Sequence, residues 1–340
     1  MLRAIRFSRF GPAHEVAEIV SLSEPGPLLD GEVRLDIEAS PINPADLLQF
    51  EGRYGAHPPA LPAYAGGEAL ALVREVGPKV PHLRPGDRVL ALLAARGNWR
   101  TSLKASAQRL FALPSADPLQ LAMLTVNPAT ALLLLNEFVS LKPGDWVIQN
   151  AANSAVGHCV IALARARGVH TLNVVRRAEL AAELRARGAD AVLLDGPDLA
   201  QRVAEYTGDA RRPKLALDAV AGDSTLHLAH SLAEGGAVVN YGMLSGQPCA
   251  IDPGDMVFRD KRLCGFWLAK WFRDATAADL KDVYVSLVKM LESGALHMPV
   301  EATYSLEDAA AALAHAARVG RVGKVLFTPN GSIAGPAPGQ

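Results

Sequence analysis

The sequence predicts an α/β protein in which a doubly wound parallel sheet is inserted into a second, β-rich domain. Three observations support this prediction. The chain has 340 residues, which is more than one hydrophobic core usually serves. Its first 118 residues are dominated by short alternating runs of polar and apolar residues. From residue 146 onward, apolar runs alternate with amphipathic helical stretches, as is typical of parallel βαβ units.

The N-terminal region is expected to be rich in strands because turn pairs such as Gly77–Pro78 and Pro85–Gly86 separate its apolar runs. The expected strands there are Leu2–Phe7, Glu32–Ala39, Glu68–Val76, Arg88–Leu92 and Arg109–Ala112. A cleaved presequence is not expected, because residues 2–7 already alternate as a strand does.

The second domain is expected to begin with one helical stretch, Leu121–Leu141, interrupted early by Pro128. The strands expected after it are Trp146–Asn150, Thr171–Val175, Ala191–Leu194, Leu215–Asp218 and Ala237–Tyr241. The helices expected between them are Val156–Arg167, Ala178–Arg187, Leu199–Tyr206 and Ser224–Leu232. A mixed segment then returns to the first domain, so residues 1–118 plus 269–340 are expected to form one domain and residues 119–268 the inserted one.

The composition excludes several classes of protein. With 34 basic and 35 acidic side chains and no basic stripe, nucleic acid is not expected as the main partner. No stretch reaches the roughly 18 consecutive apolar residues that a membrane span needs, so no membrane association is expected. The three cysteines, Cys159, Cys249 and Cys264, are too few and too scattered for a disulfide framework. A reducing, cytoplasmic location is therefore expected.

A strand, a turn and a helix start follow one another over residues 146–157, as in a dinucleotide-binding loop. The Gly-x-Gly-x-x-Gly pattern is degenerate, since Ala151 and Asn153 stand at the first two glycine-like places and only Gly157 remains. A helix N-terminus offers unpaired N–H groups and a positive dipole to a pyrophosphate. The residues predicted to contact it are Asn153, Ser154, Ala155, Val156 and Gly157. An ordinary β–α turn that binds nothing is the alternative.

The next strand ends at Arg176 and Arg177, where an NAD site would place an acidic residue for the ribose 2′-hydroxyl. Guanidinium groups can pair with a 2′-phosphate instead, so this position favours NADP. A solvated arginine pair at a helix start is the alternative.

These features resemble the medium-chain dehydrogenase/reductase superfamily and, more narrowly, the mitochondrial-type trans-2-enoyl-thioester reductases. The matching stretches are Asn43–Asp46, Gly52–Gly55, Gly97–Thr101, Val126–Ala131, Gln149–Gly157, Asn173–Arg176, Tyr241–Met243, Gly265–Leu268 and Gly323–Lys324. The resemblance implies a GroES-like catalytic domain with an inserted Rossmann domain. It also implies NADPH-dependent reduction of the carbon–carbon double bond of an enoyl-CoA or enoyl-acyl-carrier-protein.

The sequence departs from the zinc-dependent members of that superfamily. Gly67 stands where their Gly-His-Glu motif has a histidine ligand, and Asn43 lies where an upstream cysteine falls. No cysteine precedes Cys159, and a catalytic zinc needs about three protein ligands in one place. No metal is therefore expected.

Without zinc, hydrogen-bond donors must hold the enolate oxygen and an acid must protonate the α-carbon. By resemblance, that acid is Tyr54, whose phenol is protonated at neutral pH; whether it acts directly or through water is open. Asn43, Tyr54 and Trp267 are the expected substrate-binding residues, and Asn127 is expected at the nicotinamide. Each of these residues also has a purely structural alternative. Tyr54 would be a packed loop tyrosine, Asn43 and Asn127 would be turn formers, and Trp267 would be an aromatic residue of the core or of a dimer edge.

The remaining cofactor residues are expected at the ends of later strands. Tyr241, Gly242 and Met243 end a parallel strand, and Phe266, Trp267 and Leu268 form a Phe-Trp-Leu block. Lys324 could reach a phosphate or carboxamide, although a plain surface lysine is the alternative.

Three functions remain open from the sequence. The first is an enoyl-thioester reductase, the second a quinone oxidoreductase or general alkene reductase on the same fold, and the third a non-catalytic NADPH-binding protein. A homodimer is expected, in which the strand near residues 262–268 extends the sheet across a two-fold axis.

Overall fold

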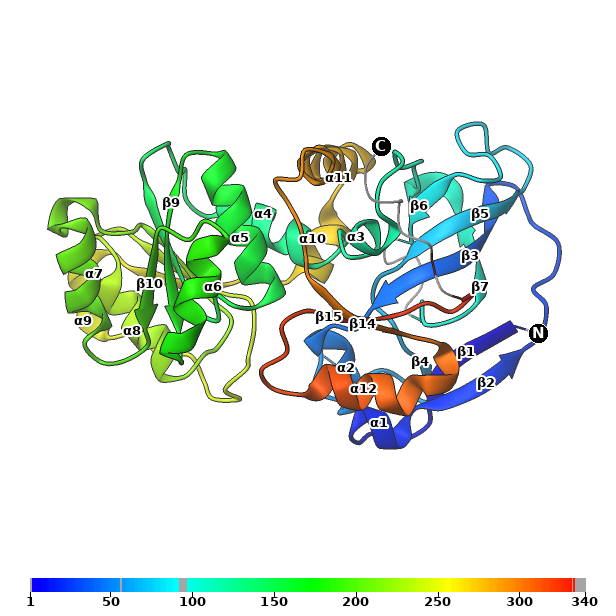
Figure 1. Cartoon of the computed structure of the whole chain (residues 1–340), viewed down its shortest axis with the longest axis horizontal. Helices are drawn as coiled ribbons and strands as arrows, with labels where there is room; N and C mark the ends of the chain where they lie inside the picture. The colour runs from blue at the N-terminus through cyan, green and yellow to red at the C-terminus, as the bar shows by residue number, and fades with distance from the viewer. Residues whose placement is uncertain (1, 56, 92–96, 332, 334–340) are drawn as a thin grey trace. The chain divides into compact units, whose positions relative to one another are not determined.

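The computed structural model describes residues 2–55, 57–91, 97–331 and 333, and it divides the chain into two compact units (Figure 1). Unit 1 comprises Met1–Val126 and Ala275–Gln340, and unit 2 comprises Asn127–Asp274. Unit 2 is thus inserted in the sequence of unit 1. The boundaries lie a few residues C-terminal to those expected from the sequence, and the expected α/β class is confirmed.

The described residues of unit 1 form two sheets. One has the order β2–β1–β4, and the other has the order β14–β15–β3–β5–β6, with β7 also paired to β3. The strands are β1 (Leu2–Phe7), β2 (Glu18–Leu22), β3 (Glu32–Pro41), β4 (Ala63–Tyr64), β5 (Leu70–Val76), β6 (Arg88–Leu90), β7 (Ser102–Ser106), β14 (Val300–Tyr304) and β15 (Lys324–Phe327). The helices are α1 (Ala13–Val16), α2 (Pro44–Phe50), α3 (Pro118–Ala122), α11 (Ala277–Glu292) and α12 (Ala309–Ala317).

An aromatic core in unit 1 holds α2 and β15 together. The Phe7 and Phe50 rings lie 4.5 Å apart, and the Trp99 and Phe327 rings lie 5.0 Å apart. These rings belong to one buried cluster that joins β1, α2 and β15. Since Phe50 ends α2 and Phe327 ends β15, the cluster fixes both elements in unit 1.

Unit 2 is one six-stranded parallel sheet. Its order is β10–β9–β8–β11–β12–β13, the order of a doubly wound dinucleotide-binding fold. The strands are β8 (Trp146–Gln149), β9 (His170–Val175), β10 (Ala191–Leu194), β11 (Leu215–Asp218), β12 (Ala237–Asn240) and β13 (Arg262–Gly265). The helices are α4 (Asn127–Glu137), α5 (Ala155–Ala166), α6 (Ala181–Ala186), α7 (Leu199–Thr207), α8 (Asp223–Ser231), α9 (Pro253–Arg259) and α10 (Leu268–Asp274).

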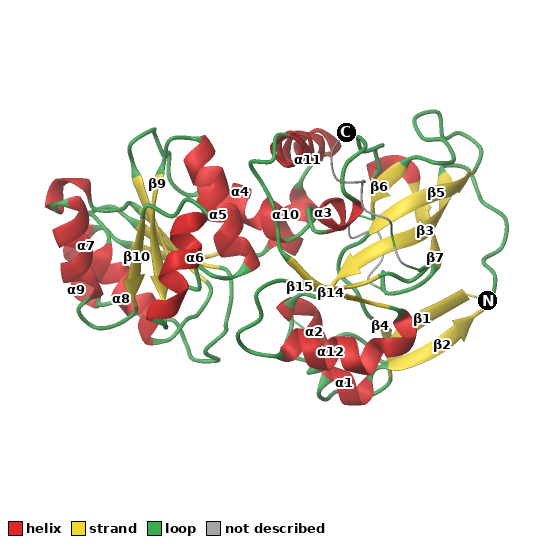
Figure 2. Ribbon diagram, viewed as in Figure 1, coloured by secondary structure: helices red, strands yellow, loops and turns green. Residues whose placement is uncertain are grey.

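Helices cover both faces of this sheet (Figure 2). One core packs Leu199, Val203 and Leu228 of α7 and α8 against the sheet, and a second packs Ile161 and Leu184 of α5 and α6. A parallel sheet that is buried on both faces needs nearly continuous apolar strands, which is why these strands were predicted from the sequence.

Three sequence-based expectations about the elements are wrong. The stretch Leu121–Leu141 forms two helices, α3 and α4, and Pro128 is the second residue of α4, where its missing N–H breaks no helical hydrogen bond. Residues 109–112 form no strand; Arg109 ends a 3₁₀ turn and Leu110 is buried. The strand expected over 88–92 ends at Leu90 within the described part, and Leu92 lies outside it.

No helix among the described residues combines the length and the apolar character that crossing a membrane requires.

Candidate functional site

The turn between β8 and α5 has the geometry of a phosphate-binding loop. Ala151 takes a left-handed conformation (φ 46°), at the place where the dinucleotide motif has its first glycine. Ser154 caps α5, its Oγ accepting from the Gly157 N–H over 3.1 Å. A Cβ at Gly157 would lie 2.6 Å from the carbonyl carbon of Ala152, so only glycine fits there. The first N–H groups of a twelve-residue helix are thereby presented at the carboxyl edge of the sheet.

Two buried side-chain amides, those of Gln149 and Asn173, hold this loop to the sheet. Gln149 Nε2 donates to the Gly157 carbonyl over 3.0 Å and to Asn173 Oδ1 over 2.8 Å. Asn173 Nδ2 in turn donates to the Ala191 carbonyl over 3.0 Å. Both side chains are fully buried, so they join β8, β9 and β10 rather than reach a ligand.

The arginine pair follows β9 at the same edge of the sheet. Arg176 and Arg177 are exposed, and Arg177 also forms an ion pair of 3.5 Å with Glu179. Exposed guanidinium groups beside a phosphate loop can pair with a second phosphate.

Asp218 holds the strand ends at this edge together, and the sequence analysis did not predict this role. It ends β11 and is fully buried. Its carboxylate accepts from Asn150 Nδ2 (2.6 Å), Thr225 Oγ1 (2.6 Å) and Asn240 Nδ2 (3.0 Å). These bonds join the carboxyl ends of β8, β11 and β12. The sequence did contain one indication of this role, because Asp218 is an acidic residue at the end of an apolar strand.

The residues after β12 and β13 complete this edge. A Cβ at Gly242 would lie 2.6 Å from the Ala219 carbonyl oxygen, so the backbone segments after β11 and β12 pack too closely for any residue but glycine at this position. Burial, and then the Asp218 carboxylate, raise the pKa of the Tyr241 hydroxyl above its ordinary range, so it stays protonated. Trp267 is 36% exposed at the end of β13, just before α10.

The predicted cofactor residues of unit 2 therefore gather at one edge. The set comprises Asn153, Ser154, Ala155, Val156, Gly157, Arg176, Arg177, Tyr241, Gly242, Met243, Phe266, Trp267 and Leu268. All of them follow the carboxyl end of a parallel strand, where ligands bind in open α/β sheets. Asn127 also belongs to unit 2; it is buried and is the first residue of α4.

In unit 1, Tyr54 lies half-buried in the turn after α2, between Gly52 (φ 69°) and Gly55 (φ 85°). The left-handed backbone on each side makes these two glycines the natural residues for this turn. The pattern Gly-x-Tyr-Gly thus forms a tight turn around one half-buried tyrosine.

Asn43 and Lys324 are in direct contact, although they are far apart in the sequence. Lys324 Nζ donates to Asn43 Oδ1, and Asn43 Nδ2 donates to Glu68 Oε1 over 2.7 Å. The Asn43 N–H donates to Asp46 Oδ2 over 2.8 Å at the start of α2. All four side chains are buried, Lys324 with 6% exposure, so the surface-lysine alternative for it is wrong.

The two carboxyl groups of this cluster have unusual pKa values. Burial raises the pKa of Glu68 to about 7, while the Lys324 ammonium and the Asn43 amide oppose that rise. Burial likewise raises the pKa of Asp46 to about 6, against the N–H of Asn43 and the charge of Lys324. Perturbed carboxyl groups beside a predicted substrate residue are typical of functional sites.

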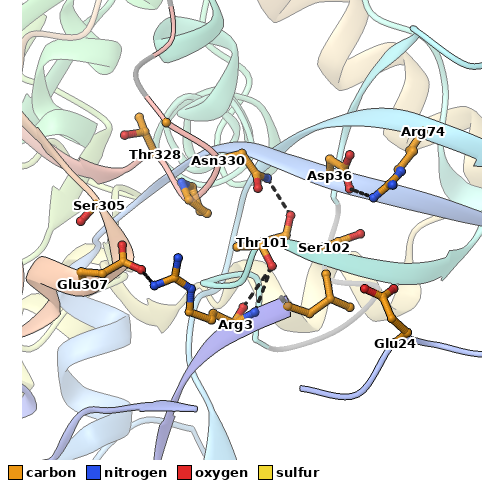
Figure 3. Close-up of a pocket in the computed structure, with 13 residues that line it drawn as sticks. Arg3, Glu24, Asp36, Arg74, Thr101, Ser102, Ser305, Glu307, Thr328 and Asn330 are labelled. Atoms are coloured by element: carbon orange, nitrogen blue, oxygen red, sulfur yellow. Dashed lines mark hydrogen bonds and ion pairs between the residues drawn. The ribbon is translucent and has the colours of Figure 1, made fainter. Parts of the chain in front are cut away.

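A pocket of about 590 Å³ elsewhere in unit 1 contains none of the predicted site residues (Figure 3). Its arginines are already paired with carboxylates, Arg74 with Asp36 at 3.8 Å and Arg3 with Glu307. Glu24 is a third carboxylate of the lining, so acidic side chains outnumber basic ones there, which does not favour a phosphate or carboxylate ligand.

Comparison with known proteins identifies the family. Two family models match the chain, the alcohol dehydrogenase GroES-like domain over residues 29–114 and the zinc-binding dehydrogenase over residues 155–289. The mitochondrial enoyl-[acyl-carrier-protein] reductase of Homo sapiens is 38% identical over 317 residues, covering 92% of this chain and 84% of that protein. The chain therefore belongs to the mitochondrial-type enoyl-thioester reductases of the medium-chain dehydrogenase/reductase superfamily, as the sequence predicted.

Solved structures agree with this assignment. The 2-enoyl thioester reductase heterodimer from Candida tropicalis and the Etr1p complex with NADP and crotonyl-CoA each match with a TM-score of 0.86 at 26% identity, covering 96% of this chain and 99% of theirs. The quinone oxidoreductase of Escherichia coli in complex with NADPH matches with a TM-score of 0.86 at 26% identity, covering 96% of this chain and all of that one.

The name of one matching model raises the question of whether the described side chains fit zinc. Among the described residues, no group of three or more His, Cys, Asp or Glu side chains could hold a metal ion. At the motif position, Gly67 donates its N–H to Asp46 over 2.9 Å, and an ammonium, that of Lys324, already lies in the cluster. The charge of this ammonium lowers the pKa of both Asp46 and Glu68, against the effect of burial.

Proposed function

We propose that this chain reduces the double bond of a trans-2-enoyl thioester with NADPH, without zinc. Membership of the enoyl-thioester reductase family carries the proposal, since 38% identity extends over 92% of the chain. The loop at Ser154–Gly157 and the exposed Arg176 support NADPH as the cofactor, because they offer sites for a pyrophosphate and a 2′-phosphate. The Etr1p complex, which holds NADP and crotonyl-CoA, supports the same pairing.

In the proposed reaction, NADPH supplies a hydride to the β-carbon of the substrate. Tyr54, which matches the tyrosine of the family's Gly-x-Tyr-Gly pattern, supplies a proton to the α-carbon, directly or through a water molecule. An ordinary phenol is protonated at neutral pH, so it can donate. Asn43 and Trp267 bind the acyl thioester. Asn127 holds the nicotinamide side of the cofactor, and Phe266 and Leu268 line it. Hydrogen-bond donors stabilise the negative charge that develops on the thioester oxygen.

The test follows NADPH oxidation with saturating crotonyl-CoA and, separately, with 9,10-phenanthrenequinone. Turnover on the thioester alone supports the proposal. Turnover on the quinone alone supports the second candidate, a quinone oxidoreductase, which the Escherichia coli neighbour favours. NADPH binding without turnover on either acceptor would indicate a non-catalytic protein. Metal analysis of the purified protein tests the zinc-free reaction; one zinc per chain would contradict it.

A homodimer belongs to the same proposal. β13 is the last strand in the sheet order of unit 2, and such an edge can pair with a second copy. The helix before it, α9, exposes Met256 (50%), Val257 (72%) and Phe258 (82%). Exposed apolar side chains on the helix that precedes an edge strand are typical of an interface. The cytoplasmic location stays a prediction, because the human relative is named mitochondrial.

A further inference from the structure

A chain of hydrogen bonds in unit 1, fully buried except at its last bond, runs from a lysine to the backbone that leads into α4. Lys324 Nζ donates to Asn43 Oδ1, Asn43 Nδ2 donates to Glu68 Oε1 over 2.7 Å, and Val126 N–H donates to Glu68 Oε2 over 2.9 Å. We propose that Lys324 and Glu68 are positioning residues of the reductase, with the Lys324 ammonium as the built-in counter-ion of Glu68. They orient the Asn43 amide and the backbone at Val126. The catalytic part of this inference rests on the proposed function.

The first step concerns the direction of the Asn43 amide. A side-chain amide has a donor end and an acceptor end that can exchange by a flip. Here an ammonium, which only donates, faces Oδ1, and a carboxylate, which only accepts when ionised, faces Nδ2. A flipped amide would oppose both charges. The pair therefore selects one orientation of a predicted substrate-binding residue.

The second step concerns the protonation of Glu68. Its two oxygens each accept one N–H, from Asn43 and from Val126. A proton on either oxygen would turn that oxygen into a donor and a poor acceptor, so one of the two bonds would weaken. Both contacts thus need the ionised carboxylate, which burial opposes. The positive charge of Lys324 is what favours it.

The charged and titratable groups around Glu68 come from three elements. Asp46 of α2 opposes ionisation by its own negative charge, and Lys324 of β15 favours it. Tyr284 of α11 is buried, and burial, with Glu68 next, raises its pKa well above the ordinary value, so it stays neutral. Lys324 is therefore the group whose removal changes the balance most directly.

The third step concerns the chain beyond Glu68. The Val126 N–H is held by Glu68, and the preceding carbonyl, that of Thr125, accepts from Tyr284 Oη over 3.0 Å. Two buried side chains thus fix consecutive residues of the backbone that continues directly into Asn127, the predicted nicotinamide residue. A weaker bond at Val126 would loosen the start of α4, and small displacements of catalytic groups are costly.

The experiment compares wild type with Lys324→Met, Glu68→Gln and the double variant, in the full-length chain. The kcat and KM for crotonyl-CoA are measured from about pH 6 to pH 9, and the NADPH dissociation constant is measured by fluorescence. Lys261→Met is the matched control, because Lys261 is also buried, donates to the Ala229 carbonyl over 2.8 Å and pairs with Asp255 at 2.9 Å, but lies in unit 2.

The Lys324→Met variant should lose about 10–100-fold in kcat near neutral pH and regain part of it toward pH 9. Without the ammonium, the pKa of Glu68 rises further, so the carboxyl group ionises only at higher pH. Glu68→Gln should lose kcat at every pH. The double variant should lose less than the product of the two single losses, because both residues act on the same Asn43 amide. Lys261→Met should keep the wild-type pH profile.

Two outcomes would overturn the inference. A weaker NADPH affinity in Lys324→Met with an unchanged kcat would make Lys324 a cofactor ligand. A loss of kcat that is the same at every pH, and that multiplies with that of Glu68→Gln, would make it a packing residue only.

A readout without turnover separates this inference from the proposed function. Both carboxyl pKa values exceed those of an unfolded chain, so ionising these groups destabilises the fold as pH rises. In Lys324→Met the folded-state pKa of Glu68 rises further, so the stability that is lost when Glu68 ionises becomes larger. The melting temperature of the variant should therefore fall further below that of wild type above about pH 7. If wild type reduces no thioester but this widening occurs, the proposed function fails and the charge pairing stands. Parallel melting curves at all pH values would reject the pairing.

Discussion

Gly157 and Ala152 approach so closely that a Cβ atom at position 157 would lie 2.6 Å from the carbonyl carbon of Ala152. This approach closes the turn that presents the first N–H groups of α5. Gly157→Ala should therefore push the loop outward, at a cost of about 1–3 kcal/mol in stability, and NADPH affinity should fall by more than about tenfold. Fluorescence titration with NADPH and thermal melting would measure the two effects.

Gly26→Ala is the control for that experiment, because no heavy atom of the described residues, apart from Gly26 and its two chain neighbours, lies within 4 Å of a Cβ built there. It should leave NADPH affinity unchanged. Equal affinities for Gly157→Ala and wild type would show that this loop does not hold the pyrophosphate.

Arg176 offers a test of cofactor choice. It is exposed after β9, where a ribose 2′-phosphate would lie. Arg176→Ala should weaken NADPH binding by about 10–100-fold, since a charge-assisted hydrogen bond is lost, and should leave NADH binding nearly unchanged. Dissociation constants for both cofactors decide the matter, with the exposed Arg185→Ala on α6 as a control. An equal loss for the two cofactors would show that Arg176 does not recognise the 2′-phosphate.

Tyr54 is the predicted acid, and substitution by phenylalanine removes only its hydroxyl group. Tyr54→Phe should lower kcat for crotonyl-CoA by about 10²–10⁴-fold, as the loss of a general acid does, with little change in NADPH affinity. Tyr206→Phe is the control, because that exposed hydroxyl donates to the Asp190 carbonyl over 2.9 Å, in unit 2. Unchanged turnover in Tyr54→Phe would reject Tyr54 as the acid.

The parallel sheet could be predicted in detail from the sequence, because its strands are buried on both faces. Ala191–Leu194 and Leu215–Asp218 have the bounds that their apolar runs predict. The helices α9 and α10 were not predicted. The apolar residues of α9 are exposed, so they form no core-facing stripe that a period of 3.6 would reveal.

The site was predictable only where a local motif carries it. The loop at Ser154–Gly157 has a strand before it and a helix after it, and both are readable in the sequence. The contact of Glu68 with Asn43 and of Asn43 with Lys324 depends on how β15 pairs with β3 and on the aromatic core, which join distant segments. No spacing in the sequence encodes that pairing, and the Asp218 network is hidden for the same reason.

His158 makes stability depend on pH in the acid range. It is buried on α5, and within the described residues its Nε2 has no hydrogen-bond partner. Burial, and then the nearby charge of Arg187, lower its pKa to about 4. As the pH falls below 6.5, the unfolded chain takes up a proton on His158 that the folded chain does not. The free energy of unfolding is therefore greatest above pH 6.5 and decreases as the pH falls toward 4.

The size of this effect follows from the shift, about 1.4 kcal/mol per pKa unit, or about 3 kcal/mol in all. His158→Met should remove it, so the free energy of unfolding of the variant should fall less than that of wild type between neutral pH and pH 4. Chemical denaturation at several pH values measures the difference. Identical acid sensitivity of the two proteins would show that His158 takes up its proton in the folded state.

The proposed dimer predicts how the protein responds to charge on α9. Val257 and Phe258 are adjacent, are 72% and 82% exposed, and precede the edge strand β13. The double substitution Val257→Asp and Phe258→Asp places two like charges on an apolar surface, and a two-fold interface would bring them near their copies. Light scattering should therefore find a dimer for wild type and a monomer for the variant. The melting temperature should change little at low protein concentration, because these side chains add nothing to the core of unit 2. A wild type that is already monomeric at micromolar concentration would reject this interface.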